Sequence, residues 1–262
     1  MKNIKAFFGG GTIGILGGLV GLGGAEFRLP MLIGIFSFSA ISAVILNKAM
    51  SLLVVGFSLL FRSSEISFSF LMEYSQIIVF MLLGSVVGAW FGAGIALKLK
   101  SDILYKTIAF LLLFIAGVLL FEQFSFESNG ALFNKESYNL AFGVFTGAFI
   151  GIVAAILGVA GGELYIPAII LIYGVDAKLA GSLSLAISLP TMLVAFFRYS
   201  RDESFKVIFE NKSFVVVMGI GSIAGAYIGA LLLGVVSNEI LIPLLCSILL
   251  VSSYKMYGHK EH

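Results

Sequence analysis

Long apolar stretches follow one another along almost the whole chain and are separated by short polar turns. A spanning helix needs about 20 apolar residues to cross a hydrocarbon core about 30 Å thick. The pattern therefore predicts an all-α polytopic membrane protein. Eight apolar segments are expected, at roughly 6–36, 40–61, 71–97, 103–121, 138–175, 177–197, 213–236 and 238–257.

The segments fall into two sets of four. The longest polar stretch lies at about 122–139 and contains Asn129-Gly130, a turn signal. We therefore expect a first transmembrane repeat over 1–121, a polar linker over 122–139 and a second transmembrane repeat over 140–262.

The two sets also repeat each other in sequence. Residues 21–30 read GLGGAEFRLP, and the corresponding residues 158–167 read GVAGGELYIP. The number of positions between these two stretches also separates GSVVGAWFGA at 84–93 from GSIAGAYIGA at 221–230. Matching segments with glycine breaks and intramembrane charges are typical of transporters, whose binding site lies at the interface of the repeats. Two homologous four-segment halves are therefore indicated.

The first segment of each half is too long for one straight helix and is expected to break near its middle. It carries glycines, then a charge, and then Pro30 or Pro167. Clustered glycines there suit unwound backbone whose N–H and C=O groups face a ligand. A kink in a packed helix is the alternative, but it leaves the neighbouring charges unexplained. The clustered glycines are Gly21, Gly23, Gly24, Gly158, Gly161 and Gly162.

Glycines in the third segment of each half recur every four residues instead. This spacing lines one face of a helix and permits close helix–helix packing, so a structural role is expected. These glycines are Gly84, Gly88, Gly92, Gly221, Gly225 and Gly229.

Charged residues follow both glycine clusters: Glu26 and Arg28 in the first half, and Glu163 in the second. A charge at the centre of the bilayer costs about 2.5 to 3.5 kcal/mol on insertion scales, so it usually faces a partner or a wet cavity. Glu26 and Arg28 point the same way if the chain is extended there, as an ion pair or a substrate clamp. Glu163 requires either a proton, which would suit proton coupling, or an ion pair with Lys48, Arg62 or Arg198.

Polar residues on the second segments are expected to line the site. Asn47 and Ser51 share a helix face beside Lys48, and Ser184 and Ser188 occupy the matching positions, although membrane serines often bond only a neighbouring carbonyl. Arg62 and Arg198 end these segments as expected interfacial anchors. The candidate substrate-binding residues are Gly23, Gly24, Ala25, Glu26, Arg28, Asn47, Lys48, Ser51, Gly161, Gly162, Glu163, Ser184 and Ser188.

Composition agrees with a membrane protein. The chain is 60% hydrophobic and 11% charged, and its net charge of +2 gives no reason to expect a nucleic-acid partner. Cys246 is the single cysteine, and His259 and His262 lie in the polar tail. Neither an internal disulfide nor a metal or other cofactor is expected.

The repeated motifs, together with AGSLSLAISLPTMLVAFFRYSRD, resemble the sulfite exporter TauE/SafE family, also called the toluene-sulfonate uptake permease family, over essentially the whole chain. Each copy here lacks one glycine of the family's Gly-x-Gly-Gly-Gly hallmark. The resemblance implies a multi-pass inner-membrane permease for sulfite, sulfonates or a related small organic anion, with alternating access and ion coupling, a proton being one option. Its expected partners are the anion and the bilayer, and a homodimer stays open.

Two other functions stay open as alternatives. A passive anion channel, or a membrane subunit of a larger complex, would also use glycine breaks and carbonyl-lined paths. An enzyme is not expected, because the only clustered polar groups lie at 198–206, which is typical of a charged cytoplasmic turn.

Membrane topology depends on whether the broken segments cross the bilayer. If they cross, the repeats are parallel and, with a cytoplasmic N-terminus, Lys98, Lys100 and Lys106 lie outside. If they return, the repeats are inverted and these lysines lie inside with Arg198 and Arg201. The positive-inside rule favours inverted repeats.

Overall fold

The computed structural model describes residues 2–20, 24–62, 74–125, 136–175, 177–232 and 238–258. All regular structure in these residues is helical, which confirms the all-α prediction. The first part of the chain contains α1 (Lys2–Val20), α2 (Ala25–Gly34), α3 (Ala40–Arg62), α5 (Ser75–Lys98) and α6 (Ser101–Ser125). The second contains α7 (Glu136–Leu157), α8 (Gly162–Tyr173), α9 (Ala177–Tyr199), η1 (Glu203–Phe205), α10 (Lys206–Glu210), α11 (Lys212–Leu232) and α12 (Asn238–Tyr257).

Six of the described helices are long and apolar enough to cross a membrane. They are α3, α5, α6, α7, α9 and α11. The chain is therefore a polytopic membrane protein. By contrast, α2 has 10 residues and α8 has 12, and at 1.5 Å per residue each reaches only about half of a 30 Å hydrocarbon core.

The predicted break in each first segment is confirmed. The segment at 6–36 is divided into α1 and α2, and the segment at 138–175 into α7 and α8. Gly24, Gly158 and Gly161 have φ angles of 66°, 68° and 86°, a left-handed region that side chains with a Cβ rarely adopt. Gly21 and Gly23 lie outside the described residues.

Glycine faces bring two helix pairs into close contact, as the four-residue spacing predicted. A Cβ on Gly84 or Gly88 of α5 would collide with the backbone of Val144 or Ala148 on α7. The α1–α11 pair repeats this arrangement, since Gly10 and Gly14 face the backbone of α11 while Gly221 and Gly225 face that of α1. Backbones at this distance gain dispersion contacts along their length.

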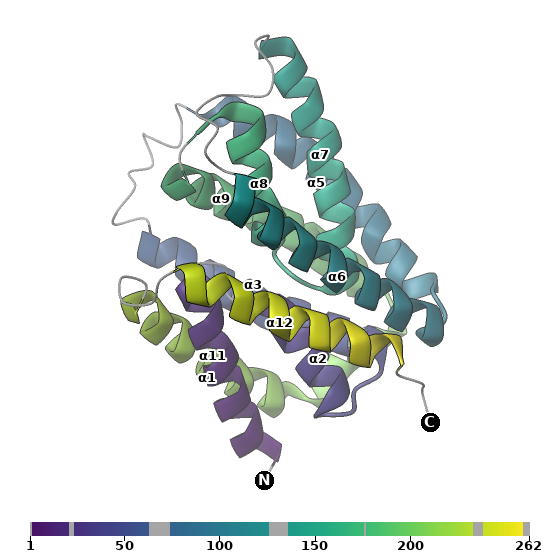
Figure 1. Ribbon diagram of the computed structural model, residues 1–262. Helices are drawn as coiled ribbons and strands as arrows, with labels where there is room; N and C mark the ends of the chain where they lie inside the picture. Colours follow the sequence, from purple (N-terminus) through teal and green to yellow (C-terminus); the bar gives the residue numbers. More distant parts are fainter. Residues whose placement is uncertain are drawn as a thin grey trace.

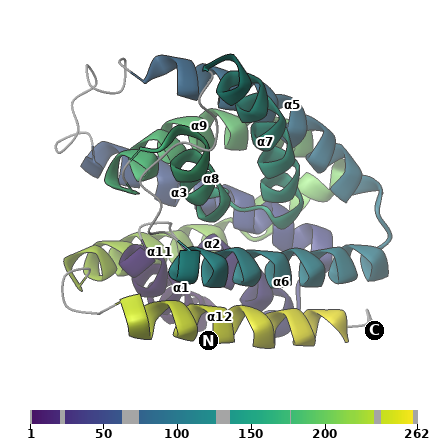
Figure 2. The same ribbon diagram turned by 45° about the horizontal axis from the view of Figure 1, so that its top comes forward.

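The α6 and α12 helices run antiparallel, side by side, in both views (Figure 1, Figure 2). Ser253 Oγ donates to the carbonyl of Ala109 at 2.7 Å, and Cys246 Sγ to that of Ala116 at 3.7 Å. A later residue of α12 thus contacts an earlier residue of α6, as expected for two antiparallel helices.

The contacts between helices are reciprocal under an exchange of the two predicted halves. The α1 helix packs on α11 and α7 packs on α5, so the first helix of each half contacts the third-segment helix of the other. Pairs of corresponding helices, α3 with α9 and α6 with α12, also contact each other. The breaks that follow α1 and α7 consequently lie among helices of both halves.

Candidate functional site

Four ionisable side chains lie in the protein interior beside the two helix breaks. Glu26 and Arg28 on α2, Lys48 on α3 and Glu163 on α8 are each at most 2% exposed. Of the thirteen candidate residues predicted from the sequence, Gly23 lies outside the described residues and the other twelve are buried. The described residues beside the breaks, the four charges and the candidate polar residues of α3 and α9 are therefore all buried.

The N-termini of α2 and α8 carry the two acids. Gly24 and Gly161 are the N-cap residues, and neither helix start has a side-chain cap. The first N–H groups of a helix have no partner within it, and they give this end a partial positive charge. Glu26 and Glu163 lie in the first turns of their helices, where that charge stabilises a carboxylate.

The two carboxyl groups lie close enough to interact with each other. Both carboxyl oxygens of Glu163, and Oε2 of Glu26, are buried without a hydrogen-bond partner. Buried carboxylates without donors are costly, and two in proximity repel. This part of the site therefore favours a proton, a donor or a bound ligand.

The Asn47 side chain forms hydrogen bonds to the backbone at both helix breaks. Its Nδ2 donates to the carbonyl of Ala25 at 2.9 Å and to that of Leu157 at 3.3 Å. The first residue of α2 and the last residue of α7 are thus held by one amide. Asn47 Oδ1 is buried and has no hydrogen-bond partner, so it remains available as an acceptor.

The Lys48 side chain caps the C-terminal end of α7. Its Nζ donates to the carbonyls of Ala154 at 3.0 Å and Val159 at 2.6 Å, and a positive charge is favourable at this end of a helix. The ammonium also interacts electrostatically with Glu163. Among the three predicted partners of Glu163, Lys48 is thus near it, whereas Arg198 instead lies over Trp90.

Arg28 occupies the first-half side of the cluster. Its Nη1 donates to Ser51 Oγ at 3.4 Å, and its guanidinium interacts electrostatically with Glu26. The expectation that Glu26 and Arg28 point the same way from an extended chain is wrong, because α2 is helical from Ala25. Two residues along a helix turn the side chain by about 200°, so the pair interacts across the helix start.

The two matching serines of α9 have different surroundings. Ser184 Oγ donates to the carbonyl of Gly181 at 2.8 Å, which is the structural alternative expected for a membrane serine. Ser188 Oγ, which matches Ser51, is buried without a hydrogen-bond partner. Ser188 therefore offers an available hydroxyl, whereas Ser184 is occupied by its own helix.

A hydroxyl cluster near the second break was not predicted from the sequence. Ser85 and Thr191 share a hydrogen bond of 2.6 Å between α5 and α9. The hydroxyl of Tyr165 is buried near this pair without a hydrogen-bond partner. Tyr165 occupies the position in the second half that matches Arg28 in the first. Its position beside α5, a glycine-rich helix of the first half, could have been inferred only from the packing of α5 on α7.

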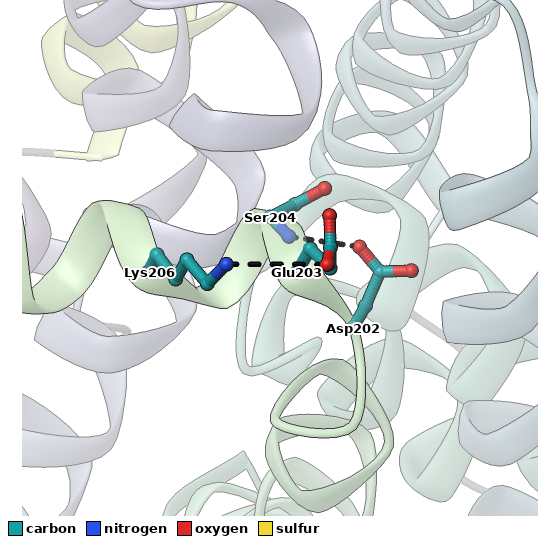
Figure 3. A network of polar contacts seen from close by, with 4 residues as sticks. All are labelled: Asp202, Glu203, Ser204 and Lys206. Atoms are coloured by element: carbon teal, nitrogen blue, oxygen red, sulfur yellow. Dashed lines mark hydrogen bonds and ion pairs between the residues drawn. The ribbon is translucent and has the colours of Figure 1, made fainter.

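Within the charged turn at 198–206, the polar contacts of Asp202, Glu203 and Lys206 are local. The side chain of Asp202 accepts a hydrogen bond from the Ser204 backbone N–H at 2.9 Å, and Lys206 Nζ lies 3.9 Å from Glu203 (Figure 3). Lys206 and Glu203 are largely exposed. In the described part of the chain, no group of three or more His, Cys, Asp or Glu side chains could hold a metal ion.

Comparison with known protein families gives a match to the family described as sulfite exporter TauE/SafE, over residues 6–256. The chain belongs to the TauE/SafE family. This TauE/SafE protein is therefore a multi-pass membrane transporter, and the breaks described above lie inside the matched range. Neither the curated proteins nor the solved structures contain a match to it.

Proposed function

We propose that this TauE/SafE protein is a secondary permease of the inner membrane. In this proposal it carries sulfite, a sulfonate or a related small organic anion by alternating access, and a proton is its coupling ion. The observation that carries the proposal is the buried cluster of two acids and two bases at the converging starts of α2 and α8. Catalysis is not part of the proposed role.

Charge balance supports the coupling. With all four groups ionised, Glu26 and Glu163 neutralise Arg28 and Lys48, so the cluster has no net charge. An additional buried anion would then be uncompensated, which costs several kcal/mol even after the protein relaxes. A proton on one carboxyl group restores neutrality, so the anion and the proton are expected to bind together.

The same proton exposes the donors that an anion needs. An ionised Glu163 competes with any anion for the positive start of α8, and Glu26 does so at α2. Once protonated, the acid releases this end to sulfonate or sulfite oxygens. Arg28 adds a charge-assisted donor, and Ser188 adds a hydroxyl without a partner. The available donors therefore suit a small oxyanion.

Helix directions support inverted repeats. The corresponding helices α6 and α12 are antiparallel, as expected if the halves enter the membrane from opposite sides. The C-terminal end of α9 also lies beside the C-terminal half of α5, because Arg198 lies over Trp90. Parallel repeats would put these two regions on opposite sides. Inverted repeats are the usual basis of alternating access around a midplane site.

A passive anion channel is the second candidate. Carbonyl groups exposed by broken helices line many pores. Here, however, Lys48 and Asn47 engage the carbonyls of Ala154, Leu157 and Val159 next to the second break. With its charges at most 2% exposed, the cluster resembles an occluded carrier site more closely than a continuous path.

Counterflow in proteoliposomes distinguishes these functions. Vesicles loaded with unlabelled sulfite or taurine-like sulfonate should accumulate the labelled anion transiently, with saturable uptake, whereas a channel gives no counterflow. Arg28→Gln should reduce the initial rate by about 10-fold or more, corresponding to one buried charge-assisted bond. The exposed Lys212→Gln is the matched control.

Two outcomes contradict the proposal. Non-saturating uptake without counterflow indicates a channel. Counterflow that survives in Arg28→Gln and in the double variant Arg28→Gln/Lys48→Gln places the anion elsewhere and removes this site assignment.

A further inference from the structure

A second cationic feature lies outside the buried cluster, where the C-terminal end of α9 lies beside the C-terminal half of α5. The guanidinium carbons of Arg198 and Arg201 are both 5.4 Å from the centroid of the Trp90 ring. Arg201 also lies 4.6 Å from the centroid of the Phe197 ring. These cation–π contacts hold both positive charges beside one aromatic ring.

The two charges are not compensated by the described residues. In that part of the chain, neither guanidinium has an ion pair or a hydrogen bond. The nearest carboxylates along the chain are engaged elsewhere: Asp202 accepts from Ser204 N at 2.9 Å, and Glu203 lies 3.9 Å from Lys206 (Figure 3). Two positive charges against one ring repel each other, and a bound anion would offset that repulsion.

The surroundings indicate where the anion comes from. Apolar side chains of the same two helices are exposed: Val87 54%, Phe91 62%, Leu193 53% and Phe197 54%. In a membrane protein such a surface faces acyl chains. A tryptophan with adjacent arginines is typical of the membrane–water boundary. A headgroup that is covalently joined to acyl chains fits both parts of this surface, whereas a soluble anion fits only the charged part.

We propose that Trp90, Arg198 and Arg201 form a binding site for the phosphodiester headgroup of an anionic phospholipid. The two guanidinium groups donate to the phosphate oxygens, and the exposed apolar residues of α5 and α9 contact the acyl chains. Because Arg198 ends α9, bound lipid would hold this helix end at the interface. The site is independent of the transported anion.

The chain itself supplies the probe, since Trp90 is its single tryptophan. Purified protein in nanodiscs is titrated with phosphatidylglycerol brominated on its acyl chains in a phosphatidylcholine background. Brominated phosphatidylcholine serves as the reference lipid. Quenching of Trp90 emission reports occupancy, and brominated phosphatidylglycerol should quench at a mole fraction severalfold lower than the reference lipid does.

Charge variants test the residues. Arg201→Gln should weaken the preference for phosphatidylglycerol about fivefold, because each basic residue near an anionic surface contributes about that factor. Arg198→Gln/Arg201→Gln should abolish it. The matched control Lys206→Gln/Lys212→Gln removes two charges from the neighbouring segment and should keep the preference. Circular dichroism verifies folding, and Arg201→Gln, which changes an exposed side chain, provides the test if the double variant is unstable.

Three outcomes overturn the proposal. Equal quenching by the two brominated lipids in the native protein removes the site. If the preference for phosphatidylglycerol is unchanged in Arg201→Gln and in the double variant, other residues bind the lipid. A saturable change in Trp90 emission when inorganic phosphate or sulfite is added to detergent-solubilised protein would assign the arginines to a soluble anion.

Discussion

At the scale of single residues, Lys48 illustrates how a buried charge can serve the fold and the site together. Its ammonium donates to one carbonyl in the last turn of α7 and to one within the second break, and it interacts electrostatically with Glu163. Removal of one partner of a buried pair leaves the other charge uncompensated. Lys48 is therefore expected to be needed for stability as well as for any coupling.

Lys48→Met should destabilise the protein by about 3 to 5 kcal/mol. The buried Cys246 is the chain's single cysteine, so a thiol-reactive fluorophore reports thermal unfolding directly. Lys206→Met removes a largely exposed lysine and should leave the melting temperature unchanged. A melting curve of Lys48→Met that coincides with that of the native protein would show that the contacts to Ala154 and Val159 contribute little.

At the scale of elements, the close helix pairs depend on glycines that face a neighbouring backbone. A Cβ on Gly88 would collide with Ala148 of α7, whereas a Cβ on Gly117 of α6 meets nothing within 4 Å. Overpacking of this kind costs about 1 to 3 kcal/mol. The same chemical change should thus have different effects at the two positions.

Gly88→Ala should lower the melting temperature by about 5 °C, since a chain of this size loses about 2 to 4 °C per kcal/mol. Gly117→Ala should preserve or slightly raise it, because alanine is the better helix former. The Cys246 assay measures both. Equal melting temperatures for the two variants would mean that α5 and α7 separate without cost, contrary to the packing described.

Features that depend on local sequence could be predicted. The breaks follow from the glycine clusters, whereas Pro30 and Pro167 lie inside α2 and α8. The α5 and α11 interfaces follow from a four-residue spacing. Lys48 was predicted as a partner of Glu163, but its bonds to the carbonyls of Ala154 and Val159 were not predicted, nor was the position of Tyr165 beside Ser85. These contacts join residues about 80 to 110 positions apart that only the packing of the helices brings together. Arg28 was predicted as a site residue, but its direction relative to Glu26 depends on α2 being helical directly after Gly24.

At the scale of the whole molecule, the antiparallel α6 and α12 support an inverted topology. Lys100, which follows α5, is then expected on the cytoplasmic side with Arg201. In a Cys246→Ser background, Lys100→Cys should react with a membrane-impermeant thiol reagent only after cells are permeabilised. Arg201→Cys should behave identically. Labelling of Lys100→Cys in intact cells would favour parallel repeats.

The central claim is that an anion and a proton share the buried cluster. Its most direct test is uptake of labelled sulfite or sulfonate into proteoliposomes under an imposed pH gradient, with Glu163→Gln compared to the exposed Glu210→Gln. The native protein and Glu210→Gln should accumulate the anion above equilibrium only while the gradient lasts. Glu163→Gln should exchange anions but lose gradient-driven accumulation. Accumulation by Glu163→Gln equal to that of the native protein would contradict the account.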